Sequence, residues 1–356
     1  MKMIVRRTVL AVCTLVLALI LPTAASAACT GFDDVPESAD CYESVMYLAK
    51  CEIVAGMGNE CFSPEQLITV EQWAVMLCRA YGAETIGDSW QDVGRSSVVE
   101  AYRQGWLNET ALSAPRSPMC RSVLVESAFA AADVPVYDST LYEGGASLST
   151  ADNILRVGRE LGLCSDDADT NALVTRGDAA IILHVVLTQS FRIEEPPVPV
   201  TLVNAAGVNI NDYLLALRQV PEPVLAAFNA AGWTYRIDFD YMGGLSKKLN
   251  MSCIGATNYS QKTIYLSEAS ATLHEFGHFL DWMLGFPAEY EQLFRAEASA
   301  APLRNYAKTD SREYFADCFA YWVKYAENAN AISLLQECAP MTYRYMEDLM
   351  RIANRL

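Results

Sequence analysis

The pentapeptide His274-Glu275-Phe276-Gly277-His278 decides how this sequence is interpreted, and it takes two of the three histidines in 356 residues. On an α-helix, residues four positions apart share one face, so both imidazoles can bind one metal ion with Glu275 beside them. The flanking segments 269–273 and 279–284 are rich in good helix formers, and Gly285 predicts the end of the helix. The pattern is typical of a catalytic zinc site.

A catalytic zinc site needs a third protein ligand and one open position. The pattern HExxHxxGxxH, with a third histidine six residues after His278, is excluded because position 284 is Leu. The segment 311–322 predicts a second helix with an aromatic buried face and Ser311 as its N-cap. Glu313 and Asp317 lie one turn apart on the same side of that helix. From the residues alone, either carboxylate can be the third ligand.

This region resembles the catalytic domain of anthrax lethal factor and its relatives, which include the secreted bacterial Pro-Pro endopeptidases. The resemblance rests on 274–281 and on 313–319, with Tyr306 seven residues before the first acid of the second run. It implies that residues 205–356 form an α+β metallopeptidase domain of the gluzincin type. It also implies that the protein is a zinc-dependent metalloendopeptidase. One branch of the family implies cleavage at proline-rich sites.

The resemblance also implies the roles of single residues. A single bound Zn²⁺ lowers the pKa of its water, a general base takes the proton, and a phenol with the metal stabilises the oxyanion. The alternative interpretation is a non-catalytic surface protein that keeps the zinc helix as a relic. The implied ligands are His274, His278 and Glu313, the base is Glu275, the phenol is Tyr306, and Asp317 supports a ligand histidine.

The first 27 residues predict an exported protein. Lys2, Arg6 and Arg7 precede an apolar run too short to span a membrane, and 25–27 is a small-residue cleavage site. We therefore expect a signal peptide over 1–27, no membrane span after its removal, and a protein that is secreted or lies on the bacterial cell surface. Its extracellular substrate would be a protein or peptide. The net charge of −17 excludes nucleic acid as a partner.

Ten cysteines remain after position 27, seven in the N-terminal part and three in the C-terminal part. In an oxidising compartment an even total favours disulfides. Because both parts hold an odd number, the sequence predicts either one bridge between the parts or an unpaired thiol in each.

The N-terminal half predicts an all-α module of three repeats over 28–189. The repeats resemble the S-layer homology (SLH) module, which binds anionic cell-wall polysaccharide. The counterparts of its binding motif are 69–72, 120–123 and 175–178, and arginine is kept only as Arg121 and Arg176. We expect these two arginines to bind wall polymer. The alternative is a helical spacer, and His184, in an apolar helix, is expected to be a core or semi-buried residue and not a metal ligand.

A proline-rich linker is predicted over 190–204, and one hypothesis is that a sister molecule cleaves it at Pro196-Pro197. After it we expect a helical segment with a break at two prolines, a strand, and a hairpin whose edge can pair with an extended peptide. Two further helices complete the domain. The ranges are 212–231 for the broken helix, 233–240 for the strand, 252–257 and 262–267 for the hairpin, and 288–298 and 332–356 for the last helices.

Overall fold

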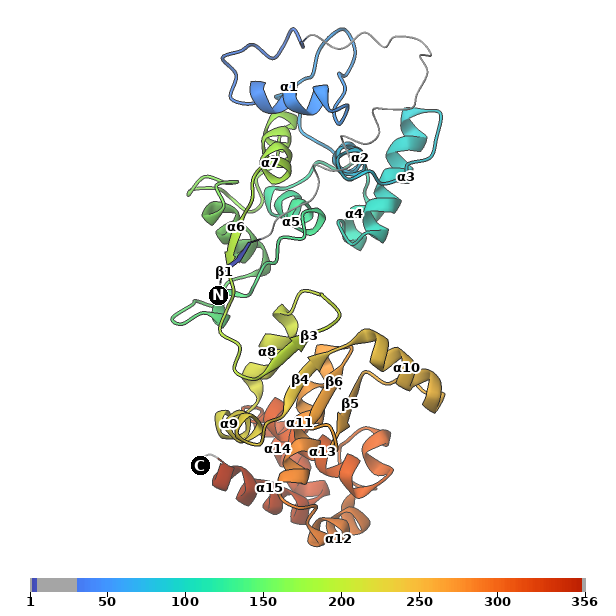
Figure 1. The fold of residues 1–356 in the computed structure, drawn as a ribbon, viewed down its shortest axis with the longest axis vertical. Helices are drawn as coiled ribbons and strands as arrows, with labels where there is room; N and C mark the ends of the chain where they lie inside the picture. The colour runs from blue at the N-terminus through green and yellow to red at the C-terminus, as the bar shows by residue number, and fades with distance from the viewer. Residues whose placement is uncertain (1, 5–30, 354–356) are drawn as a thin grey trace. The chain divides into compact units, whose positions relative to one another are not determined.

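The computed structural model describes residues 2–4 and 31–353, arranged in two compact units (Figure 1). The first spans Met1–Pro196 and the second spans Pro197–Leu356. The boundary falls inside the predicted linker 190–204, but parts of that segment are short strands and not a free spacer. The predicted signal peptide lies almost entirely outside the described residues. Within the described residues, every helix is too short or too polar to span a membrane.

The N-terminal unit is a helical module, and most of its helices begin at a polar capping residue. Thr69 and Gln72 form a capping box at the start of α2, each side chain accepting a hydrogen bond from the other residue's backbone N–H. Thr175 caps α7 in the same way, with its hydroxyl accepting from Asp178 N. The elements are β1 (Lys2–Ile4), α1 (Tyr42–Lys50), α2 (Val70–Tyr81), α3 (Trp90–Arg103), α4 (Glu109–Ser113), α5 (Arg121–Ala131), η3 (Ser139–Leu141), α6 (Thr150–Glu160), α7 (Arg176–Thr188) and β2 (Arg192–Glu194), which pairs antiparallel with β1.

Three short segments that precede α2, α5 and α7 meet in a closed ring of backbone hydrogen bonds. Ile68 N donates to Val174 O, Val174 N donates to Met119 O, and Met119 N donates to Ile68 O, each at 3.0 Å. Each segment belongs to a different one of the predicted repeats. The ring joins the first segment to the last, and α1 packs against α7 accordingly.

The C-terminal unit packs helices against a four-stranded sheet of order β3-β4-β6-β5. β3, β4 and β6 are parallel, and β5 lies antiparallel to β6 at one edge, which confirms the predicted hairpin. The elements are β3 (Leu202–Asn204), α8 (Asn211–Gln219), α9 (Glu222–Ala230), β4 (Thr234–Ile237), α10 (Phe239–Leu249), β5 (Gly255–Asn258), β6 (Thr263–Leu266), η4 (Ala269–Ala271), α11 (Thr272–Met283), α12 (Ala288–Glu297), η5 (Asn305–Lys308), α13 (Ser311–Tyr325), α14 (Ala329–Cys338) and α15 (Pro340–Ala353).

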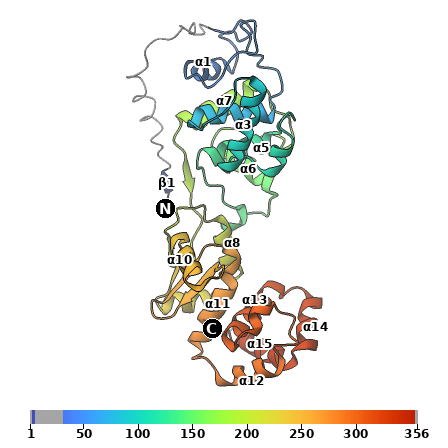
Figure 2. The same cartoon turned by 90° about the vertical axis from the view of Figure 1, so that its right-hand side faces the viewer.

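The helix α11 lies between the sheet and α13 (Figures 1 and 2). On the sheet side its Phe276 and Phe279 pack against Phe228 and Trp233, with ring centroids 4.9–5.9 Å apart among these contacts. All four side chains are at most 1% exposed. Burial of aromatic surface of this size is the main stabilising term of such a core. It fixes α11 on the sheet and leaves its opposite face to α13.

Three predicted boundaries are wrong, and capping explains two of them. The strand ends at Ile237 because Asp238 caps a new helix, α10, by accepting from Tyr241 N. The N-cap of α13 is Asp310, which accepts from two backbone N–H groups, and not Ser311. The single helix predicted over 332–356 is two helices, since Pro340 has no N–H and begins α15.

Candidate metal centre and active site

The close approach of α11 to α13 brings the histidines to the second helix. A Cβ atom on Gly277 would lie 2.6 Å from Ala316 Cα, so only glycine permits this approach. The two histidines of the motif stack on the α11 face that meets α13, as the i, i+4 spacing predicts. Their ring centroids are 4.7 Å apart and their planes nearly perpendicular.

His274, His278 and Glu313 converge, with one ligand atom of each lying within 4.8 Å of the others. The Nε2 atoms of the two imidazoles are 3.1 Å apart. Glu313 Oε2 lies 3.1 Å from His274 Nε2 and 3.4 Å from His278 Nε2. The structure thus brings together the three residues that the resemblance implies as metal ligands.

The donor set fits a divalent cation such as Zn²⁺. Glu313 Oε2 is buried beside both rings without a hydrogen-bond partner among the described residues, so these atoms converge without satisfying one another. Burial lowers the pKa of His274, but Asp317, Glu313 and Glu275 outweigh it and raise that pKa to about 9. Two imidazoles and one carboxylate are a common ligand set of catalytic zinc, with a fourth position left open.

Asp317 orients the first histidine. Its Oδ1 accepts a hydrogen bond of 2.6 Å from His274 Nδ1, which carries the proton when Nε2 faces the metal position. Burial raises the pKa of Asp317, but His274 and then Arg304 outweigh it and lower that pKa. Of the two acids that the sequence left open, Glu313 faces both Nε2 atoms and Asp317 stands behind one ring.

Arg304 is a site residue that the sequence analysis missed. Its Nε and Nη2 donate to Asp317 Oδ2 and Oδ1 at 2.6 and 2.7 Å, a bidentate pair. Its guanidinium also lies 5.3 Å from the centroid of the Tyr306 ring. Arg304 thus joins the carboxylate behind His274 to the loop that holds Tyr306.

Glu275 is held beside the three donors by β5. Its side chain is 4% exposed, and Oε2 accepts a hydrogen bond of 2.7 Å from Thr257 Oγ1. A Cβ atom on Gly255 would lie 2.5 Å from Oε1, so the glycine makes room for the carboxylate. Oε1 accepts no hydrogen bond from the described residues and is available to a water or substrate.

Tyr306 lies in η5 and is 42% exposed. Its ring centroid is 6.3 Å from that of His274. Burial, and then the negative charge of Glu313, raise the pKa of Tyr306 to about 12. At neutral pH the phenol therefore keeps its proton and can donate a hydrogen bond to a bound oxygen.

We predict that Arg304→Ala weakens zinc binding about 10- to 100-fold, because the buried carboxylate of Asp317 loses its bidentate partner and no longer orients His274. Arg304→Lys should recover only part of the affinity, since an ammonium cannot form the two parallel bonds. Competition with a chromophoric chelator measures both. The matched control is Arg295→Ala, which removes an exposed arginine paired with Glu291 at 2.9 Å. Unchanged affinity in Arg304→Ala would contradict this role.

Comparison with known proteins bears on both halves of the chain. Residues 238–349 match the family model described as anthrax toxin lethal factor, N- and C-terminal domain. The C-terminal region is lethal factor-like. Residues 31–72 match the S-layer homology domain, within the first of the predicted repeats. Both resemblances stated from the sequence are thereby confirmed.

One solved structure similar to this chain is the Pro-Pro endopeptidase PPEP-2 from Paenibacillus alvei. The two share 19% sequence identity with a TM-score of 0.34, over 42% of this chain and 96% of that chain. No curated protein matches the sequence. The lethal factor-like match contains every residue of the metal centre described above.

The two arginines expected to bind wall polymer differ in their surroundings. Arg121 Nη2 lies 3.6 Å from Asp178 Oδ2, so its charge is already paired. Arg176 is 5% exposed, donates through Nε to Phe62 O at 2.9 Å, and lies 4.6 Å from the centroid of the Phe62 ring. It lines a cavity of about 440 Å³ together with Arg79 and Trp90. Only Arg176 therefore combines the expected motif position with a cavity.

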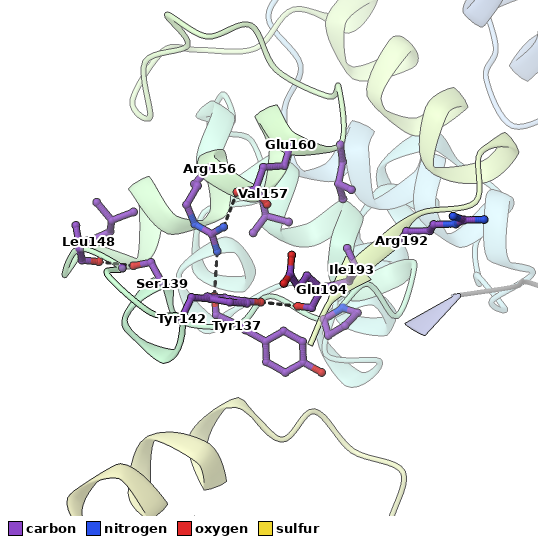
Figure 3. A pocket seen from close by; sticks show the side chains of 14 residues that line it. Tyr137, Ser139, Tyr142, Leu148, Arg156, Val157, Glu160, Arg192, Ile193 and Glu194 are labelled. Atoms are coloured by element: carbon purple, nitrogen blue, oxygen red, sulfur yellow. Dashed lines mark hydrogen bonds and ion pairs between the residues drawn. The ribbon is translucent and has the colours of Figure 1, made fainter. Parts of the chain in front are cut away.

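A second cavity of the N-terminal unit, about 480 Å³, lies between α6, the segment 135–148 and β2 (Figure 3). Arg156 Nη1 donates to Glu160 at 2.6 Å, and the Tyr142 hydroxyl donates to Glu194 O at 2.6 Å. These polar groups are engaged with one another and hold β2 against the module. The cavity lies in a different unit from the metal centre.

The remaining expectations concern His184, the cysteines and the linker. His184 Nδ1 lies 3.0 Å from Ser44 Oγ and packs on Tyr47, in agreement with a structural role. None of the nine described cysteines forms a disulfide, so the expected bridges are not confirmed. In the linker Pro196 is buried, and Pro199 O accepts a hydrogen bond from Asn229. Cleavage at Pro196-Pro197 stays a prediction, and it would require this segment to detach first.

Proposed function

We propose that this chain is a secreted, wall-associated zinc metalloendopeptidase of the gluzincin type that hydrolyses peptide bonds in extracellular proteins. The observation that carries the proposal is the convergence of His274, His278 and Glu313 beside a buried Glu275 with one free carboxylate oxygen. The match of this region to the lethal factor model supports it.

Each residue of the site has a separate role in peptide hydrolysis. A zinc ion held by the three ligands would supply Lewis-acid activation of water and of the scissile carbonyl. Glu275 takes the proton of the attacking water at Oε1, while Thr257 holds Oε2, and it then passes that proton to the leaving amine. The phenol of Tyr306 donates to the oxygen that becomes negative. Asp317 and Arg304 keep His274 in the orientation that this geometry needs.

Zinc content and peptide cleavage, measured on the same preparation, test the function. We expect one zinc per chain, cleavage within a combinatorial peptide library, loss of cleavage with a chelator, and recovery when Zn²⁺ is added back. The library should contain proline-rich members, since one branch of the resembling family implies them. A protein that binds zinc and cuts no peptide would instead support the relic interpretation.

A second function, binding of an anionic wall polymer, is favoured by the cavity at Arg176. Arg176 has no carboxylate within 4.0 Å among the described residues, although the charge of Asp34 acts on it, and it donates to the backbone carbonyls of Phe62 and Ala55. Arg79 lies beside it, and Trp90 is 50% exposed, a side chain suited to stack on a sugar ring. The match of 31–72 to the SLH domain agrees with this role.

We predict that Arg79→Glu lowers binding to purified cell-wall polysaccharide about tenfold, because it places a negative charge where an anionic group is expected. Arg103→Glu, with 72% side-chain exposure and no place in the cavity, is the matched control. Sedimentation with cell-wall fragments measures both. Equal polysaccharide binding by the two variants would show that this cavity does not bind the polymer.

A further inference from the structure

Arg312 is a cation at the metal centre that the mechanism does not use. It stands next to Glu313, its side chain is exposed, and its guanidinium lies 4.3 Å from the centroid of the Phe286 ring. Among the described residues no carboxylate lies within 4.0 Å of it, although Asp310 and Asp281 are close enough to share its field. Arg304, in contrast, forms a bidentate pair with Asp317. Arg312 is thus the arginine of the centre whose charge is free to meet a ligand.

The residue on which the Arg312 guanidinium stacks, Phe286, has an unusual backbone conformation. Phe286 has φ = 55°, in the left-handed region, directly after Gly285 at φ = 75°. Bulky residues avoid this region, and such strain is concentrated at functional sites. The conformation lets Phe286 N donate to Asp281 O at the end of α11 and sets the ring against Arg312. A stacked guanidinium keeps its in-plane N–H donors directed outward.

Tyr259 lies against Phe286, and Tyr259, Phe286 and Arg312 together are called the wall below. It follows β5, and its ring meets the Phe286 ring edge-on at a centroid distance of 5.5 Å. Burial raises the pKa of Tyr259 above its ordinary value, and of the nearby charges Asp281 raises it further. The charges of Arg312 and Glu275 also act on this hydroxyl. The phenol stays neutral, and its hydroxyl has no hydrogen-bond partner among the described residues.

The wall stands at the end of the strand that a substrate would follow. β5 is the edge of the sheet, and its Thr257 bonds directly to Glu275. An extended peptide that pairs with this edge passes Glu275 and reaches Tyr259 within two residues of Thr257. A peptide bound along this edge would therefore pass close to Tyr259, whose ring contacts the Phe286 ring on which Arg312 stacks.

This inference deepens the proposed peptidase function and rests on it. We propose that Tyr259, Phe286 and Arg312 form a subsite that binds an acidic side chain, Asp or Glu, of the peptide substrate. The guanidinium supplies two parallel donors that match a carboxylate, and the phenol supplies a third. The chain as a whole carries a net charge of −17 and repels acidic peptides, so recognition of an acidic residue needs a local cation of this kind.

Matched peptides test the subsite. Quenched fluorogenic peptides that differ only by Glu, Gln or Lys at one position are scanned over the three residues on each side of the cleaved bond. For the wild-type protein we expect kcat/KM to be about tenfold higher with Glu than with Gln at one position. Arg312→Gln should remove this preference chiefly by lowering cleavage of the Glu peptide, and Arg312→Glu should transfer it to Lys. Tyr259→Phe should reduce it in part.

Controls separate recognition from folding and from activity itself. Arg344→Gln removes an exposed arginine of α15 and should leave the preference intact. Zinc content and the thermal unfolding midpoint should be unchanged in Arg312→Gln, and the Kd of inactive Glu275→Gln for the Glu and Gln peptides gives a readout without catalysis. An active enzyme that treats Glu and Gln alike at every position, or a preference that survives Arg312→Glu, overturns the subsite alone. Failure to cleave or bind any peptide overturns the proposed function and the subsite with it.

Discussion

Glu275→Gln is expected to lower kcat about 1,000-fold while zinc content and the unfolding midpoint stay at their wild-type values. An amide cannot take the proton of the attacking water, but it has nearly the same shape as the carboxylate. Its oxygen can still accept the hydrogen bond from Thr257 Oγ1, so the buried position beside β5 is kept. Single-turnover hydrolysis of a peptide found in the library measures the effect.

The same substitution at an exposed glutamate provides the control. Glu268 lies just before α11, is exposed, and lies 3.3 Å from the hydroxyl of Ser270. Glu268→Gln should therefore leave kcat unchanged. If Glu275→Gln kept more than a tenth of the wild-type kcat, another group would have to act as the base.

Glu313→Ala should weaken zinc binding by more than about 100-fold and abolish hydrolysis with it, because one of three protein ligands is lost. The affinity also depends on pH, with a sign set by His274. Its pKa is raised to about 9 in the metal-free protein, so zinc must displace a proton below that pH, and binding weakens as the pH falls. Competition with a chromophoric chelator over a pH series measures both effects.

Glu327→Ala, at an exposed position after α13, is the control for this loss and should bind zinc as the wild type does. The expectation for Asp317→Ala is intermediate, since that carboxylate orients a ligand without facing the metal position. Equal zinc affinity in Glu313→Ala and the wild type would show that a different group completes the site.

The sequence predicts the centre of this site well because its signals are local. The i, i+4 spacing on α11 places His274 and His278 on one face whatever the rest of the fold does. Choosing between Glu313 and Asp317 required the family resemblance, since both lie on the same side of α13. The structure distinguishes the two carboxylates by position. Glu313 faces both Nε2 atoms, and Asp317 lies behind the His274 ring.

The sequence did not predict which residues of separate segments contact one another. Thr257 and Arg304 lie 18 and 13 residues along the chain from the carboxylates that they hold, and no spacing rule joins a strand or loop to a carboxylate on a helix. The charge of Arg121 shows the reverse case. Its motif position predicted an arginine that binds wall polymer, and Arg121 lies 3.6 Å from Asp178 on another helix. Boundaries failed where one capping residue outweighed a periodic pattern, as at Asp238.

The ring of hydrogen bonds among Ile68, Met119 and Val174 sets a limit on how the N-terminal module can evolve. An open solenoid gains or loses a unit at either end, because each unit contacts only its neighbours. Here the segment at Val174 returns to the segment at Ile68, so inserting or deleting one such segment would leave a donor and an acceptor without counterparts. The number of segments in the ring is thereby fixed by geometry, and a chain cut short before Val174 could not complete the ring.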